Sequence, residues 1–382
     1  MARSPAALPQ DNFVLLDGLR GLGALLVLIG HTMMYWGPYT APSGAVIVDL
    51  FFLLSGFVIA YAYEPRFHAG MRAAEFMTHR VVRVYPLYLL GTLLGFVGLS
   101  VMALGDLDGI DRVGSYALQL IPQLFMLPSP EVLGNVKMYS MNSPAWTLFF
   151  ELFVNIVYIL TFRWLRDTRV LIGVVIACAA FLAFAVFSYG MIDQGSHWEG
   201  WWVGFARGGF GFFAGVLSYR LLGQPRTAAR PVSRWAFVIL VTIPIACFVP
   251  ATPQMRPFLD LTLAVLLGIP LLWVSQSVAP PTKWHSLFIV GGRISYAVYI
   301  LHQPFREVAE RITWRSSILL DTAPLPGIVI LVTIVTLAYF AERFYDRPLR
   351  RFVVAKLKQR AARKQKQRPP AGRPSVGAIS AR

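Results

Sequence analysis

Ten long apolar segments constrain this chain more than any other feature of its sequence. A helix needs about 20 apolar residues to cross the hydrocarbon layer of a membrane. Backbone polar groups find no partner in lipid, so such segments fold as helices. We therefore expect an all-α integral membrane protein with about ten transmembrane helices. The predicted spans are 15–35, 45–63, 84–104, 145–162, 169–190, 200–219, 235–250, 258–276, 286–305 and 325–342.

The composition supports this fold class. The chain is 56% hydrophobic and only 14% charged, whereas soluble domains carry roughly 25% charged residues. A further apolar piece from Tyr116 to Pro128 is short and contains a proline, so we expect an interfacial or re-entrant segment there. Cys178 and Cys247 lie in apolar runs without a CxxC motif, and we expect no thiolate metal site and no other metal.

Basic residues predict the orientation and the domain organisation. Arginines concentrate in loops that share one side if the N-terminus is cytoplasmic, and the positive-inside rule then places both termini in the cytoplasm. We expect a cytoplasmic segment at 1–12, a transmembrane domain at 13–346 and a basic, disordered tail at 347–382. The net charge of +16 comes largely from that tail. We interpret the tail as a determinant of topology that contacts anionic lipid, and not as a nucleic-acid reader.

Ionisable residues inside a membrane are costly and usually functional, and the predicted spans contain several of them. His31, Asp49, Glu151, Arg207 and His302 come from five different spans. Counting along each span places them at a similar depth in the outer half of the membrane. This convergence predicts a polar chamber that opens outward. Plainer interpretations remain: a packing role for His302, a structural ion pair between Asp49 and Arg207, and a loop-anchoring role for Glu151.

Two arginine patterns accompany these residues. His31 follows Arg20 by eleven residues, which is about 16 Å along a helix and nearly the same helical face. Arg80 and Arg83 are three residues apart on one face, near the predicted cytoplasmic surface. Guanidinium groups suit phosphate oxygens, although the positive-inside rule alone also explains this pair. Glycines at small-xxx-small spacing predict close helix packing; they are Gly204, Gly208, Gly211 and Gly215.

The sequence resembles the acyltransferase-3 family of integral-membrane acyltransferases, of the O-acetyltransferase type, over about residues 13–351. The motifs that carry the resemblance are the Arg20-to-His31 element, "VDLFFLLSGFVIA", "RVVRVYPLY", "SPAWTLFFELF", "GRISYAVYILHQP" and "ERFYDRPLRR". Thr147 stands where the family often has serine. The resemblance implies about ten helices in the bacterial inner membrane. It also implies transfer of an acyl group, usually acetyl, from cytoplasmic acyl-CoA to a hydroxyl.

The resemblance and the spacing together give a mechanistic hypothesis. We expect His31 to act as a general base, since imidazole has an ordinary pKa near 6.5, or to carry the acyl group transiently. Asp49 or Glu151 would fix its tautomer, as the third member of a triad does. The expected acyl-CoA phosphate ligands are Arg20, Arg80 and Arg83. The other expected pocket residues are Ser143, Trp146, Arg207 and His302.

The acceptor and the class of activity keep alternatives. We expect a hydroxyl of a surface or exported glycan, or of a lipid-linked saccharide, because the polar residues lie in the outer half. A small molecule or lipid on the cytoplasmic side is the first alternative. A transporter or flippase without acyl-CoA chemistry is the second, because such proteins also carry polar residues at mid-membrane. The sequence indicates no oligomeric state.

Overall fold

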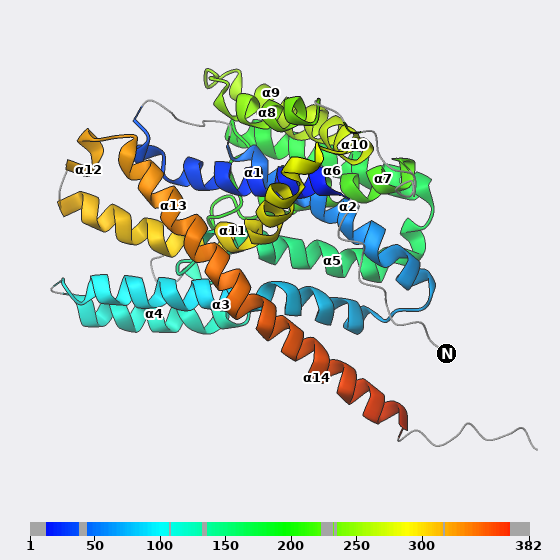
Figure 1. The fold of residues 1–382 in the computed structure, drawn as a ribbon, viewed down its shortest axis with the longest axis horizontal. Helices are drawn as coiled ribbons and strands as arrows, with labels where there is room; N and C mark the ends of the chain where they lie inside the picture. The colour runs from blue at the N-terminus through cyan, green and yellow to red at the C-terminus, as the bar shows by residue number, and fades with distance from the viewer. Residues whose placement is uncertain are drawn as a thin grey trace, which may run out of the picture.

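A helix, or a run of consecutive helices, covers each of the ten predicted spans (Figure 1). The structure is a computed structural model, and it describes residues 13–37, 44–106, 108–131, 136–222, 232, 235–315 and 318–366. All regular elements in this part of the chain are helices, which confirms the all-α prediction. The α-helices are α1 (Val14–His31), α2 (Val46–His68), α3 (Ala73–Ala103), α4 (Gly109–Leu124), α5 (Trp146–Leu165), α6 (Thr168–Tyr189), α7 (Val203–Leu222), α8 (Trp235–Phe248), α9 (Arg256–Leu261), α10 (Gly268–Ser277), α11 (His285–Arg315), α12 (Ile318–Asp321), α13 (Leu325–Phe340) and α14 (Arg347–Lys366).

Within the described residues, seven helical segments are long and apolar enough to cross a membrane. They are Val14–His31, Val46–His68, Ala73–Ala103, Ser143–Leu165, Thr168–Tyr189, Arg256–Ser277 and Leu325–Arg360. Helices α7, α8 and α11 lie on the other three predicted spans. The count of ten spans and the cytoplasmic position of both termini stay predictions.

Two elements differ from the predicted boundaries. Helix α3 begins at Ala73 and not at residue 84, and Arg80 and Arg83 lie within it, one turn apart. The short apolar piece that follows forms most of α4, which packs along α3 (Figure 1). The piece is therefore helical and packs against α3, and both the interfacial and the re-entrant interpretations stay predictions.

The expected disordered tail differs as well. Its first part forms α14, which continues α13 through a π-helical turn, η6 (Ala341–Asp346). Pro348 follows this turn, and a proline supplies no backbone N–H. A π-helical turn is one way for a helix to absorb such a break in its hydrogen bonds. Residues 1–12 and 367–382 lie outside the described residues.

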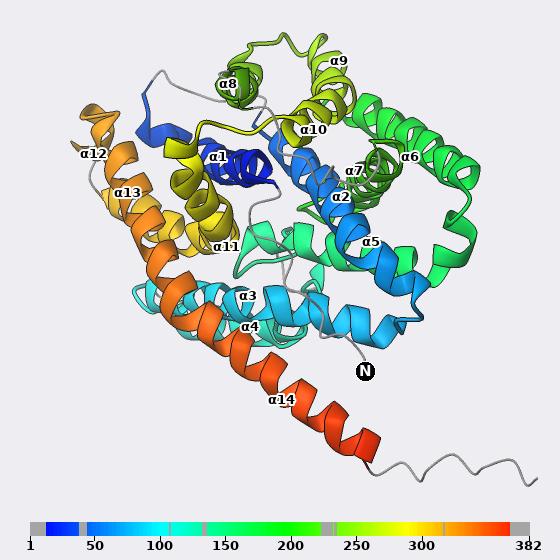
Figure 2. The same ribbon diagram turned by 45° about the vertical axis from the view of Figure 1, so that its right-hand side comes forward.

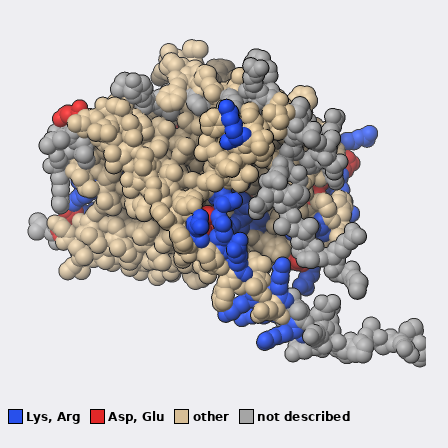
Figure 3. All heavy atoms as spheres, in the orientation of Figure 1, with Lys and Arg blue, Asp and Glu red and all other residues tan. Residues whose placement is uncertain are grey.

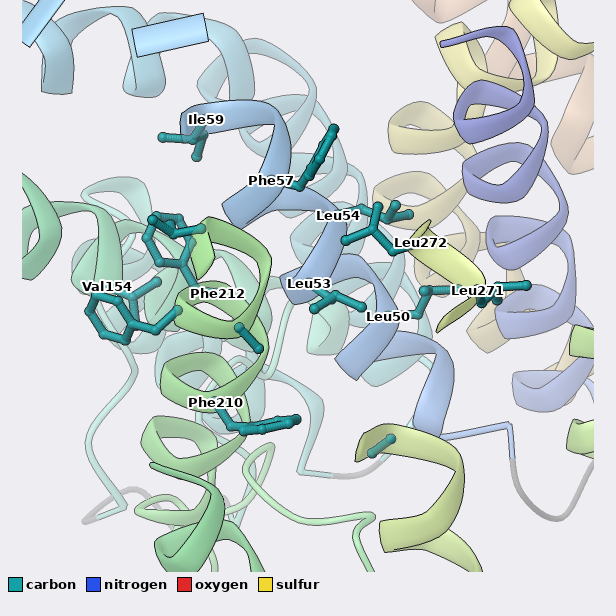
Figure 4. Close-up of a cluster of buried hydrophobic side chains, with 14 of the residues drawn as sticks. Leu50, Leu53, Leu54, Phe57, Ile59, Val154, Phe210, Phe212, Leu271 and Leu272 are labelled. Carbon is teal, nitrogen blue, oxygen red and sulfur yellow. The ribbon is translucent and has the colours of Figure 1, made fainter. Parts of the chain in front are cut away.

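Helix α2 lies in the centre of the bundle, with α5, α6 and α7 on one side and α10 on another (Figure 2). Its most apolar window is 67% buried, against 22% for α6 at the periphery. Leucine and phenylalanine side chains of α2 face both α7 and α10, as Figure 4 shows for Leu53 and Leu54. Burial on all sides explains why α2 is apolar around its whole circumference.

Two helix pairs approach closely because glycines leave room for backbone. A Cβ atom on Gly21 of α1 would lie 2.9 Å from the carbonyl carbon of Gly291 in α11. A Cβ on Gly215 of α7 would fall on the carbonyl oxygen of Leu53 in α2. The close packing predicted from the glycines of α7 is therefore confirmed, and α1 is held in register against α11.

Candidate active site

The close contact between α1 and α11 brings two predicted site residues together. The imidazole rings of His31 and His302 stack with centroids 4.9 Å apart and planes inclined by 29°. His302 is fully buried, whereas His31, the last residue of α1, is exposed. The ring of His302 therefore packs against His31 from the buried side, and His31 stays accessible to a reactant.

Hydrogen bonds within each helix orient both rings. Nδ1 of His31 lies 3.0 Å from the carbonyl oxygen of Val27, and Nδ1 of His302 lies 3.3 Å from that of Val298. A carbonyl oxygen only accepts hydrogen bonds, so the neutral ring carries its proton on Nδ1. The lone pair then resides on Nε2, which in His302 is buried without a partner among the described residues. Both imidazoles thus present a basic nitrogen away from their own helix.

The acceptor at Nδ1 of His31 is therefore a backbone carbonyl, and not a carboxylate as in a catalytic triad. Within the described part of the chain, neither Asp49 nor Glu151 contacts His31. Each carboxylate is bound by a different arginine. The catalytic role proposed for these two acids stays a prediction, without a contact to the imidazole that would support it.

Asp49 and Arg207 form a buried ion pair with two hydrogen bonds. Arg207 donates from Nε and Nη2 to the two carboxylate oxygens, at 3.1 Å and 2.8 Å. The guanidinium also donates to the carbonyls of Gln194 and Ala45 and lies over the indole of Trp146. Both charged groups are fully enclosed, and such a pair is costly to break from one side. This arrangement matches the structural alternative for Asp49 and Arg207.

A cavity of about 120 Å³ gathers four other predicted residues within an otherwise mostly apolar lining, and we call it the polar cavity after these charged side chains. Arg20 of α1, Arg80 and Arg83 of α3, and Glu151 of α5 all line it. Glu151 accepts hydrogen bonds from the Arg80 guanidinium and, at 2.7 Å, from the Ser55 hydroxyl. The predicted phosphate ligands thus share one cavity, but Arg80 is already paired. Of the five intramembrane residues, His31 contacts His302 and Asp49 binds Arg207, whereas Glu151 binds Arg80, so these contacts do not join the five in one chamber.

Tyr299 joins this cavity to the two histidines. Tyr299 lines the cavity, its hydroxyl lies 2.9 Å from that of Thr147, and its ring contacts that of His302 with centroids 6.2 Å apart. Tyr299 was not among the site residues predicted from the sequence, although it precedes His302 by three residues, the spacing of one helical face. Ser143 begins the short helix η3 (Ser143–Ala145), where the Pro144 carbonyl accepts from Thr147 at 2.9 Å.

Comparison with known proteins indicates the family of the chain. Residues 13–343 match a family model described as an acyltransferase domain, Acyl_transf_3. The chain is 40% identical over 158 residues to "Protein 2 in picA locus" of Rhizobium radiobacter, covering 39% of this chain and 82% of that protein. It is 30% identical over 147 residues to "Acyltransferase MdmB" of Streptomyces mycarofaciens, covering 37% of this chain and 34% of that protein. No solved structure matches.

The family match covers the helices from α1 to α13, and with them the cavity arginines and both histidines. It confirms the resemblance found in the sequence motifs. The chain belongs to the acyltransferase-3 family.

Proposed function

We propose that the protein is a multi-pass O-acyltransferase of the bacterial inner membrane. It moves an acyl group, most simply acetyl, from cytoplasmic acyl-CoA to a hydroxyl of a surface or exported glycan. The observation that supports this proposal is the position of Tyr299. It lines the polar cavity together with Arg20 and Arg83, and its ring contacts that of His302, which stacks on His31.

The residues fit the two ends of such an acyl donor. Guanidinium groups bind phosphate oxygens, and Arg83 is exposed and makes no ion pair within the described residues. The separation of Arg20 and His31 on α1, about 16 Å by helical rise, suits the thin arm that carries the thioester. The thioester supplies an electrophilic carbonyl and a thiolate leaving group.

His31 performs the proton transfer in this proposal. Its Nε2 accepts the proton of the attacking hydroxyl while the hydroxyl oxygen bonds to the thioester carbon. The carbon–sulfur bond breaks, and the imidazolium returns the proton to the leaving thiolate, so that the ring ends neutral. The Val27 carbonyl keeps the proton on Nδ1 throughout. A second route, in which Nε2 itself takes the acyl group, uses the same lone pair.

Purified protein in nanodiscs, incubated with labelled acetyl-CoA, tests the proposal. We expect CoA to be released and the labelled acetyl group to be recovered as free acetate, on an added acceptor or on the protein. The His31→Ala variant should release no CoA. Absence of CoA release by the intact protein under all conditions would favour a transporter or flippase. The acceptor is identified by comparing the masses of surface glycans from cells with and without the gene. A glycan that lacks the mass of an acyl ester when the gene is absent identifies both the acyl group and the acceptor.

A further inference from the structure

A second pocket, larger than the polar cavity, lies where α14 leaves the bundle. It has a volume of about 700 Å³, and we call it the basic pocket. Six cationic side chains line it: Arg83, Arg293, Arg347, Arg350, Arg351 and Lys358. Figure 3 shows Lys and Arg side chains gathered on this part of the surface. Four of these six belong to α14, which lies in the segment predicted from the sequence to be a disordered tail.

Only two of the six cations are neutralised by the protein. Arg347 binds Glu342 at 2.7 Å, and Arg350 binds Asp346 at 2.6 Å. The other four cations are exposed and form no ion pair among the described residues: Arg83, Arg293, Arg351 and Lys358. Like charges gathered from three helices repel one another, and a concave cationic surface concentrates anions. The pocket is therefore built for a ligand with more than one negative charge.

Aromatic rings and pocket size narrow the ligand class. Tyr63 and His79 also line the basic pocket, with ring centroids 6.4 Å apart. A base can stack on such rings while guanidinium groups bind phosphates. The volume lies within the usual range for small-molecule sites, roughly 300–1,000 Å³. A nucleotide that carries several phosphates fits all three features.

Arg83 links the two spaces, because it lines both the basic pocket and the polar cavity. A wide cationic pocket that meets a narrow polar cavity matches a ligand with a bulky phosphorylated end and a thin arm. We propose that the basic pocket holds the nucleotide end of the acyl-CoA, and that Arg351 and Lys358 of α14 determine specificity for its phosphates. This inference rests on the proposed function. The family model ends at residue 343 and the motif "ERFYDRPLRR" ends at Arg351, so Lys358 lies beyond both.

Binding of coenzyme A, measured by calorimetry in phosphatidylcholine nanodiscs, tests the proposal without requiring turnover. The test variant is Arg351→Ala with Lys358→Ala. The matched control is Lys356→Ala with Arg360→Ala, which removes two exposed cations of α14 that do not line the pocket. We expect the dissociation constant to rise at least about tenfold in the test variant only, since a hydrogen bond to a charged group contributes about 1.5–3 kcal/mol. Adenosine 3′,5′-bisphosphate should compete with coenzyme A.

Kinetics with a truncated acyl donor separates the two proposals. Acetyl-pantetheine carries the thioester without the nucleotide, so its KM should be equal in the test variant and the intact protein. That equality also shows that the variant is folded. Equal coenzyme A affinity in the test and control variants overturns the inference and leaves the proposed function intact. Coenzyme A binding that depends on α14 but yields no transfer overturns the proposed function alone. If coenzyme A binds nowhere and phosphatidylglycerol alone stabilises the protein through Arg351 and Lys358, the pocket is a lipid headgroup site and the inference is overturned.

Discussion

Arg80 and Arg83 lie one turn apart on α3 but face different surroundings. Arg80 is 7% exposed and holds the carboxylate of Glu151. Arg83 is exposed and lies where the polar cavity meets the basic pocket. One arginine therefore shapes the cavity, and the other is free to meet an anion.

Replacing Arg83 with alanine should raise the KM for acyl-CoA at least about tenfold and change kcat little, because a charge-assisted contact to phosphate is lost. Steady-state kinetics over a range of acyl-CoA concentrations measures both parameters. Arg83→Lys serves as the control, since it retains the charge and should recover part of the affinity. An unchanged KM in Arg83→Ala would remove this residue from the binding site.

Replacing His31 with glutamine should lower kcat by about 10²–10⁴-fold, the usual contribution of a general base. Glutamine places an amide group near the position of Nε2 but cannot accept the proton at neutral pH. Turnover is measured as CoA release, and thermal unfolding shows that the variant is folded. Activity within a factor of a few of the intact protein would mean that another group takes the proton.

Replacing Gly21 with alanine should destabilise the protein, because the new Cβ would lie 2.9 Å from the backbone of Gly291. Overpacking of this kind costs about 1–3 kcal/mol. Gly30→Ala is a matched control on the same helix, since no atom lies within 4 Å of its added Cβ. Thermal unfolding in detergent should show a lower midpoint for Gly21→Ala and no loss for Gly30→Ala. Equal midpoints would contradict the close contact between α1 and α11.

Replacing either member of the Asp49–Arg207 pair should cost about 3–5 kcal/mol of unfolding free energy, because the remaining charge is buried without its partner. The double variant Asp49→Leu with Arg207→Met should be more stable than the sum of the single effects predicts. Denaturant unfolding of the four proteins gives this coupling as a double-mutant cycle. Strict additivity would show that the two side chains do not interact.

The sequence predicted the helices well because apolar runs report directly on the membrane environment. It predicted the polar extensions of these helices poorly. Helix α3 begins with Ala73, Ala74 and Glu75, good helix formers that carry no hydropathy signal. Helix α14 is polar as well, and its continuity with α13 through η6 and its contacts with α3 make it part of the fold.

The pairing of site residues was harder to predict than their depth. A count along a span gives the depth of Glu151 but not the direction in which its side chain points. That direction depends on how α5 is rotated against α2 and α3, where Ser55 and Arg80 bind the carboxylate. The hydrogen bonds of the two imidazoles were easier to predict from the sequence, since Val27 and Val298 each precede a histidine by four residues.

The hydrogen bonds from His31 to Val27 and from His302 to Val298 stay inside single helices. The protonation pattern of each base is consequently a local property that travels with its helix. If the helices move apart to admit a bulky acceptor, the two rings can separate and return to contact without a change of tautomer. Ion pairs such as Asp49–Arg207 cross between helices and would resist such a movement. The tautomer of each histidine would thus be independent of such a movement.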